Sequence, residues 1–125
     1  MIFHHAGIAV NNIEDAVASL RESFPEIELL SDPVFDENQN VRLILVRYKG
    51  LIMELIEGET VKKILKKGQP HYHNCYEVSD IDKTLLEIKD YVLVKAPCSA
   101  ILFDGRRVVF IYHSVLGLIE LLEKG

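Results

Sequence analysis

Four residues of this chain have the types and the spacing to bind a metal ion. His5 and His73 each open a short apolar run, and Glu54 and Glu120 each interrupt a later apolar run. The glutamate follows its histidine by 49 residues in the first half of the chain and by 47 in the second. Imidazoles and carboxylates are ligands for divalent transition-metal ions, whereas a buried carboxylate without a partner is costly. A lone histidine in a strand is usually structural, but the recurrence of the pair favours a metal site.

The repeat extends to the residues around each histidine and predicts a β-strand there. Alternate side chains of a strand point to opposite faces, so His5, Gly7 and Ala9 share one face. The residues between them are apolar and should pack beneath the helix that follows. Because Gly7 and Ala9 are small, the face that carries His5 has room for a ligand.

Each predicted histidine strand is followed by a helix. Asn12 is a good N-cap, and apolar residues then fall on one helical face until Pro25 ends the helix. The same spacing returns from Ile81 in the second half. A short strand follows each helix, and Pro97 is expected to end the second of these short strands.

A hairpin should close each half, at residues 41–57 and 107–122. The prediction is an α+β protein with two βαβββ modules that form one curled mixed β-sheet around a cleft. The modules comprise residues 1–58 and 70–125 of a single domain, residues 1–125.

A connecting helix is predicted between the modules, from Thr60 as its N-cap to a stop at Gly68. It carries four lysines, which are Lys62, Lys63, Lys66 and Lys67. A solvated helix face is the ordinary interpretation. The alternative is an anchor for a phosphate-bearing ligand such as coenzyme A.

Composition limits the classes of function. A net charge of −5 without a long basic stripe argues against nucleic acid as a partner. No apolar run is long enough to span a membrane, and the first residues follow a strand pattern rather than a signal-peptide pattern. Two cysteines without a CxxC motif indicate no disulfide framework, so a cytoplasmic location is expected.

Four motifs in this order resemble the vicinal oxygen chelate superfamily, which includes glyoxalase I, methylmalonyl-CoA epimerase, extradiol dioxygenases and bleomycin-resistance proteins. The resemblance covers essentially the whole chain and is greatest to the methylmalonyl-CoA epimerase-like branch. The motifs are HAGIAV at residues 5–10, MEL at 53–55, YHNCYEV at 72–78 and GLIEL at 117–121.

The resemblance implies a glyoxalase-like fold in which His5, Glu54, His73 and Glu120 bind a divalent ion. This ligand set suits Co, Zn, Mn, Ni or Fe and does not choose among them. The implied activity is a metal-dependent epimerase or isomerase that removes a proton next to the carbonyl of a small acyl substrate, such as a CoA or carrier thioester. Glu54 or Glu120 is the candidate base, and Glu37 is an outside candidate.

Two departures from the epimerase pattern bear on the substrate. Asn38, beside Glu37, stands where the epimerases carry a carboxylate, and the loop at residues 96–105 lacks their glycine-rich form. Arg106 and Arg107 could hold a substrate carboxylate, although ordinary strand-edge charges explain them equally well. Cys75 shares the strand face of His73 and could line the cavity or be a small buried hydrophobe.

Other members of the superfamily define the alternatives. One is a lactoylglutathione lyase-like enzyme, and another is an iron dioxygenase that uses His5, His73 and Glu120 as a two-histidine, one-carboxylate triad. From a different class comes a metal-free protein that sequesters a small molecule, as resistance proteins do. A homodimer is the expected assembly.

Overall fold

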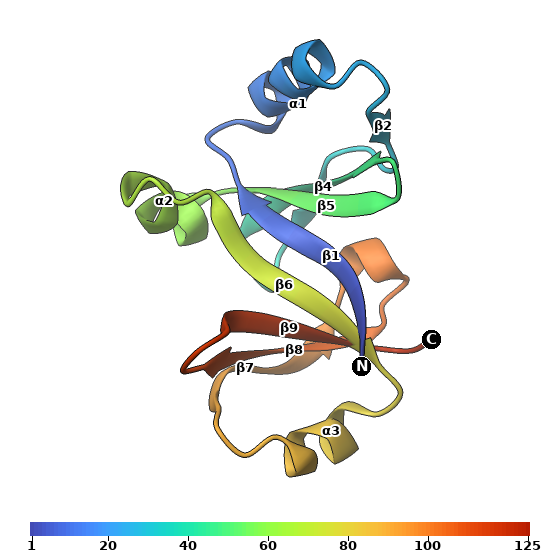
Figure 1. Cartoon of the computed structure of the whole chain (residues 1–125), viewed down its shortest axis with the longest axis vertical. Coiled ribbons are helices and arrows are strands. Elements are labelled where there is room, and N and C mark those ends of the chain that lie inside the picture. The colour runs from blue at the N-terminus through green and yellow to red at the C-terminus, as the bar shows by residue number, and fades with distance from the viewer. The chain divides into compact units, whose positions relative to one another are not determined.

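Strands are the most frequent elements of this protein, and α1 and α3 each pack against one face of the strands in their own unit (Figure 1). The computed structural model describes residues 1–125 and divides them into two compact units. The N-terminal unit comprises residues 5–72, and the C-terminal unit comprises residues 1–4 and 73–125. Nine strands and three α-helices make up the chain, and its predicted α+β class with two βαβββ modules is confirmed.

In the N-terminal unit the strands pair in the order β2-β4-β5-β1, and β3 also pairs with β4. Strand β1 runs parallel to β5, whereas the other pairs are antiparallel. The elements are β1 (Ile2–Ala9), α1 (Ile13–Ser23), β2 (Glu28–Leu29), β3 (Val34–Asp36), β4 (Val41–Tyr48), β5 (Leu51–Glu57) and α2 (Glu59–Lys66).

The C-terminal unit repeats the plan with the order β6-β9-β8-β7. Here β6 runs parallel to β9, and the remaining pairs are antiparallel. The elements are β6 (His71–Val78), α3 (Ile81–Glu87), β7 (Val92–Ser99), the 3₁₀ turn η1 (Ile101–Phe103), β8 (Arg107–His113) and β9 (Gly117–Glu123).

Each unit has its own apolar core between its helix and one face of its strands. Ile13 of α1 packs with Ile44 and Leu55, and the predicted apolar face of the helix contacts the same cluster. Ile81 of α3 packs in the same way with Ile111 and Leu121. Because side chains alternate along a strand, the neighbours of Leu55 and Leu121 point to the face away from the helix. Those neighbours include Glu54 and Glu120.

A glutamate at the end of β5 and of β9 holds the start of each helix. The backbone N–H of Ile13 donates to Glu57 at 2.8 Å, and that of Ile81 donates to Glu123 at 2.8 Å. The first N–H groups of a helix have no partner within the helix, so these carboxylates satisfy one of them in each module. The cap residues Asn12 and Asp80 satisfy another in each helix.

An arginine braces each of these carboxylates. Arg42 contacts Glu57 at 3.1 Å and Glu14 at 2.9 Å. Arg107 lies 3.4 Å from both Glu123 and Asp82. The structure therefore explains Arg107 by structural ion pairs in its own unit.

The structure corrects two local expectations. Thr60 is not the N-cap of α2: Gly58 holds that position, and the Thr60 hydroxyl donates to the carbonyl of Gln39 at 3.1 Å. Strand β7 does not end before Pro97 but continues to Ser99, with register shifts against β8. A proline fits there because β7 pairs with β8 alone, so an edge strand needs no N–H at that position.

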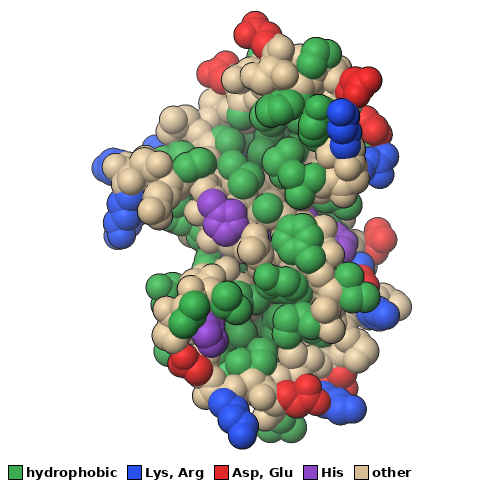
Figure 2. Space-filling model, viewed as in Figure 1, with side chains coloured by type: hydrophobic (Ala, Val, Ile, Leu, Met, Phe, Trp, Pro, Cys, Tyr) green, Lys and Arg blue, Asp and Glu red, His purple; other side chains and the backbone are tan.

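Charged side chains are unevenly distributed over the surface. Lysine and arginine side chains gather over α2, at one end of the N-terminal unit (Figure 2).

The longest helix, α1, has 11 residues, and no helix combines the length and the apolar character needed to cross a membrane.

Removal of either strand-end glutamate should destabilise its module. We expect Glu57→Ala and Glu123→Ala each to lower the free energy of unfolding by about 1–2 kcal/mol, the usual cost of losing a helix cap. Glu57→Gln should cost less, because an amide oxygen still accepts from Ile13. Urea unfolding measures the change, with Glu22→Ala at an exposed position of α1 as the control. Losses no larger than the control's would contradict this role.

The arginine brace should also make stability depend on pH. Hydrogen bonding from Arg42 holds the pKa of the Glu14 carboxyl below its ordinary value. A carboxylate with a lowered folded-state pKa stabilises the fold above its unfolded pKa, and the contribution is lost as pH falls through the folded value. Arg42→Met should therefore be less stable than wild type near about pH 7, and the difference should shrink near about pH 3. A difference that is independent of pH would refute this account.

Candidate metal centre

In the N-terminal unit, His5 and Glu54 come together because β1 and β5 are parallel neighbours. Their register places Gly7 opposite Glu54, so His5 lies two residues along the same face of β1. The imidazole Nε2 of His5 is 3.9 Å from Oε1 of Glu54, with side-chain exposures of 0% and 5%. The result is a buried imidazole–carboxylate pair on the face away from α1.

The C-terminal unit builds the same pair from β6 and β9. Cys75 lies opposite Glu120 in the parallel register, and His73 precedes Cys75 by two residues. Nε2 of His73 is 3.3 Å from Oε1 of Glu120, with side-chain exposures of 0% and 3%. Each predicted histidine is therefore next to the glutamate of its own module.

The neighbours of the two pairs differ in size. Gly7 faces Glu54 from β1, whereas Cys75, which is fully buried, occupies the equivalent place opposite Glu120. On the antiparallel side, Leu45 pairs with Glu54. Phe110 is its counterpart opposite Glu120. Glu54 therefore has smaller strand neighbours than Glu120.

Phe110 also restricts the imidazole of His73. The two rings meet edge to face, with centroids 5.3 Å apart and planes at 85°. Such packing limits rotation of the imidazole about its χ2 bond, since the aromatic ring fills the space beside it. This contact could not be predicted, because Phe110 resembles the other apolar residues of β8.

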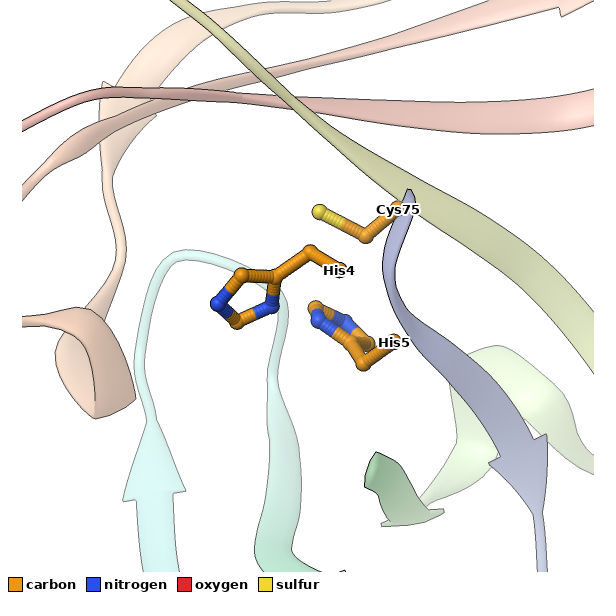
Figure 3. A group of neighbouring side chains, drawn as sticks. All are labelled: His4, His5 and Cys75. Carbon is orange, nitrogen blue, oxygen red and sulfur yellow. The ribbon is translucent and has the colours of Figure 1, made fainter. Parts of the chain in front are cut away.

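His4 lies near Cys75 in the C-terminal unit, which includes residues 1–4. Figure 3 draws Cys75 on β6 with His4, which precedes His5 on β1. Ligand atoms of His4 and Cys75 lie within 4.8 Å of each other, and the His4 ring meets Phe103 edge to face at 5.1 Å. The buried position of Cys75 agrees with the interpretation of a small buried hydrophobe.

The third candidate base lies apart from the imidazole–carboxylate pairs. Glu37 and Asn38 are exposed on the turn between β3 and β4. The preceding Asp36 is buried and accepts from the backbone N–H of Asn38 at 2.9 Å. Gln39 donates to the same carboxylate at 2.8 Å. Asp36 therefore fixes the turn that carries Glu37.

Arg106, the other candidate for a substrate carboxylate, is also held within its unit. It contacts the Glu77 carboxylate, and its Nε donates to the backbone oxygen of Glu123 at 2.7 Å. Hydrogen bonding from Arg106 lowers the pKa of Glu77. The guanidinium thus ties β6 to the end of β9.

The donor atoms of each pair fit a transition-metal ion. Ligands about 2.1 Å from one ion lie roughly 3–3.5 Å apart in tetrahedral or octahedral geometry. The separation of 3.3 Å in the His73–Glu120 pair falls in this range, and the 3.9 Å of the His5–Glu54 pair is slightly wider. Imidazole and carboxylate together favour ions such as Zn, Co, Mn, Ni or Fe.

Comparisons with known proteins agree with this architecture. The family model described as "Glyoxalase/Bleomycin resistance protein/Dioxygenase superfamily" matches residues 4–110. A comparison with curated protein sequences gives no match.

Solved structures similar to this chain include two methylmalonyl-CoA epimerases. The enzyme from Mycobacterium tuberculosis is 22% identical, with a TM-score of 0.79 over 98% of this chain and 87% of its own. The Streptomyces coelicolor enzyme, in complex with 2-nitronate-propionyl-CoA, is 20% identical, with a TM-score of 0.82 over 100% and 95%. A hypothetical protein from Bacillus halodurans is 24% identical, with a TM-score of 0.81 over 98% and 94%.

These identities are too low to carry more than the fold. The family match, by contrast, spans most of the sequence and includes three of the four predicted ligands. The repeated pairing of a histidine strand with a parallel glutamate strand is consistent with that match. The chain belongs to the glyoxalase/bleomycin resistance protein/dioxygenase superfamily.

Proposed function

We propose that this protein is a metal-dependent epimerase or isomerase that acts on a small acyl substrate by removing a proton next to a carbonyl. The observation that carries the proposal is the buried imidazole–carboxylate pair, which occurs in the same strand register in both modules. Buried carboxylates are expensive to keep charged, and two of them in equivalent places indicate a shared purpose.

His5, Glu54, His73 and Glu120 are the proposed ligands of one divalent ion. Two carboxylates balance the charge of such an ion, and two neutral imidazoles complete a set of four protein donors. The metal remains one of Co, Zn, Mn, Ni or Fe in this proposal, because the donors suit each of them. When bound, the ion supplies a Lewis acid that stabilises negative charge developing on a carbonyl oxygen.

Glu54 is the proposed base. Its carboxylate lies farther from its histidine than that of Glu120, and Gly7 opposite it leaves space for a substrate. Glu120, which is flanked by Cys75 and Phe110, has less space and serves as a ligand only. Glu37 has a weaker claim, since its side chain is exposed on the turn between β3 and β4.

The solved epimerase structures support an acyl thioester as the class of substrate. One of them is described in complex with methylmalonyl-CoA, and another with a propionyl-CoA analogue. We therefore propose a CoA or carrier thioester for this chain. A single domain of residues 1–125, with modules 1–58 and 70–125, and a homodimeric assembly complete the proposal.

Loss of one histidine should remove the metal. We expect His73→Ala to lose both bound metal and epimerase or isomerase activity while its circular dichroism spectrum stays that of the wild type. His5→Ala should behave in the same way, because the proposed site needs both modules. Metal content by mass spectrometry after reconstitution with Co, Mn, Ni and Zn is the measurement, and His113→Ala is the control.

Two results would redirect the proposal. A wild-type protein that binds none of Co, Zn, Mn, Ni and Fe would refute the proposal and favour the metal-free binding protein. Tight binding of Fe with oxygen consumption, and without exchange of a substrate proton, would instead favour the dioxygenase.

Substitution of the proposed base should separate metal binding from proton transfer. Glu54→Gln keeps an oxygen donor, so we expect it to retain most of the metal. Its activity should fall about 100-fold or more, the usual contribution of a positioned general base. Exchange of the substrate α-proton with deuterium, followed by NMR, measures the step directly. If Glu54→Gln retains wild-type exchange, Glu54 is not the base.

A further inference from the structure

The N-terminal unit has a cavity that plays no part in the proposed proton transfer. Its volume is about 390 Å³, which lies within the usual range for small-ligand pockets. None of its lining residues is a proposed metal ligand. They come from the end of β1, from β3 and β4, and from the junction of β5 with α2: Val10, Asn11, Phe35, Asn40, Val41, Arg42, Glu57, Gly58, Glu59 and Lys62.

The wall of this cavity suits an uncharged aromatic ring. Phe35 leaves half of its surface exposed, and Asn11 and Asn40 offer amide donors and acceptors beside it. The charges in the wall neutralise each other, since Arg42 contacts Glu57 and Lys62 contacts Glu59 at 2.6 Å. Arg42, held by Glu57 and Glu14, leaves little free positive charge inside the cavity, whereas the Lys62–Glu59 pair at its mouth is exposed and therefore weak. A purine base could stack on the phenylalanine and use the amides for its polar edge.

Positive charge begins at the mouth of the cavity and continues along α2. Lys62 lines the cavity, and Lys66 is four residues further, on the same side of the helix. Lys63, Lys66 and Lys67 are exposed on the same helix. In a chain with a net charge of −5, this surface is a local exception that suits phosphate.

Two close contacts to the backbone of residues 39 and 40 hold the start of α2 against the cavity wall. The Thr60 hydroxyl donates to the carbonyl of Gln39, which precedes the lining residue Asn40. A Cβ atom on Gly58 would lie 3.0 Å from the carbonyl oxygen of Asn40, so glycine allows the close approach. The base pocket and the lysine surface are thus held together within one unit.

We propose that this cavity and the lysines of α2 bind a phosphorylated purine nucleotide, with the base against Phe35 and the phosphates on Lys62 and Lys66. In a CoA thioester this would be the nucleotide end of the molecule, and to that extent the inference rests on the proposed function. The lysine surface then has a binding role beyond that of a solvated helix face.

Calorimetric titration of chelator-treated protein tests nucleotide binding apart from the metal. Wild type should bind CoA about tenfold or more tightly than 4′-phosphopantetheine, which lacks the nucleotide. Phe35→Leu and the double variant Lys62→Glu/Lys66→Glu should each weaken CoA binding about tenfold. The double variant Lys83→Glu/Lys89→Glu makes the same charge change in the C-terminal unit, and its affinity should stay within about twofold of wild type.

The possible outcomes separate this inference from the proposed function. Absence of CoA binding, equal affinity for CoA and 4′-phosphopantetheine, or an equal loss in the Lys83/Lys89 variant would overturn the nucleotide site. If 3′,5′-ADP or ATP binds as tightly as CoA, the site stands and a free nucleotide is its source. A protein that binds CoA but no metal would refute only the proposed function, and one that binds metal but not CoA would refute only this inference.

Discussion

The parallel pairing of a histidine strand with a glutamate strand is the constraint on which the rest of the structure depends. A shift of one residue would turn Glu54 or Glu120 to the opposite face, away from its histidine. In both modules the glutamate strand ends in a second carboxylate, Glu57 or Glu123, that accepts from the first turn of the helix after the histidine strand. The helix cap, the arginine brace and the strand register therefore support one another.

The internal repeat uses this arrangement twice and varies its surroundings. Equivalent registers hold His5 with Glu54 and His73 with Glu120. The chain segments that connect β1 to β5 and β6 to β9 nevertheless differ in length. Gly7 and Cys75 occupy the same place with very different volumes. Smaller neighbours at Glu54 than at Glu120 provide a physical basis for different roles of the two glutamates in the proposed reaction.

Periodicity was sufficient to predict the histidine strands, the helices that follow them and the two hairpins, but not the short strand β3 or the full length of β7. The alternation of small and apolar residues around His5, and the helical spacing from Ile13 and Ile81, depend on local chain geometry. The partner of each arginine could not be predicted, because Arg42 and Arg107 reach carboxylates that are distant in sequence. Propensity also failed where tertiary contacts decide, as at Thr60, whose hydroxyl bonds a neighbouring turn instead of capping α2.

The proposed function has one central claim, which is that a single ion takes ligands from both modules. X-ray absorption spectroscopy of the cobalt-loaded protein tests this claim most directly, because it reports the types of donor around the metal. The account predicts one cobalt per chain with two imidazole ligands, oxygen donors and no sulfur. Two cobalt ions per chain with one imidazole each, or sulfur from Cys75 in the coordination shell, would contradict it.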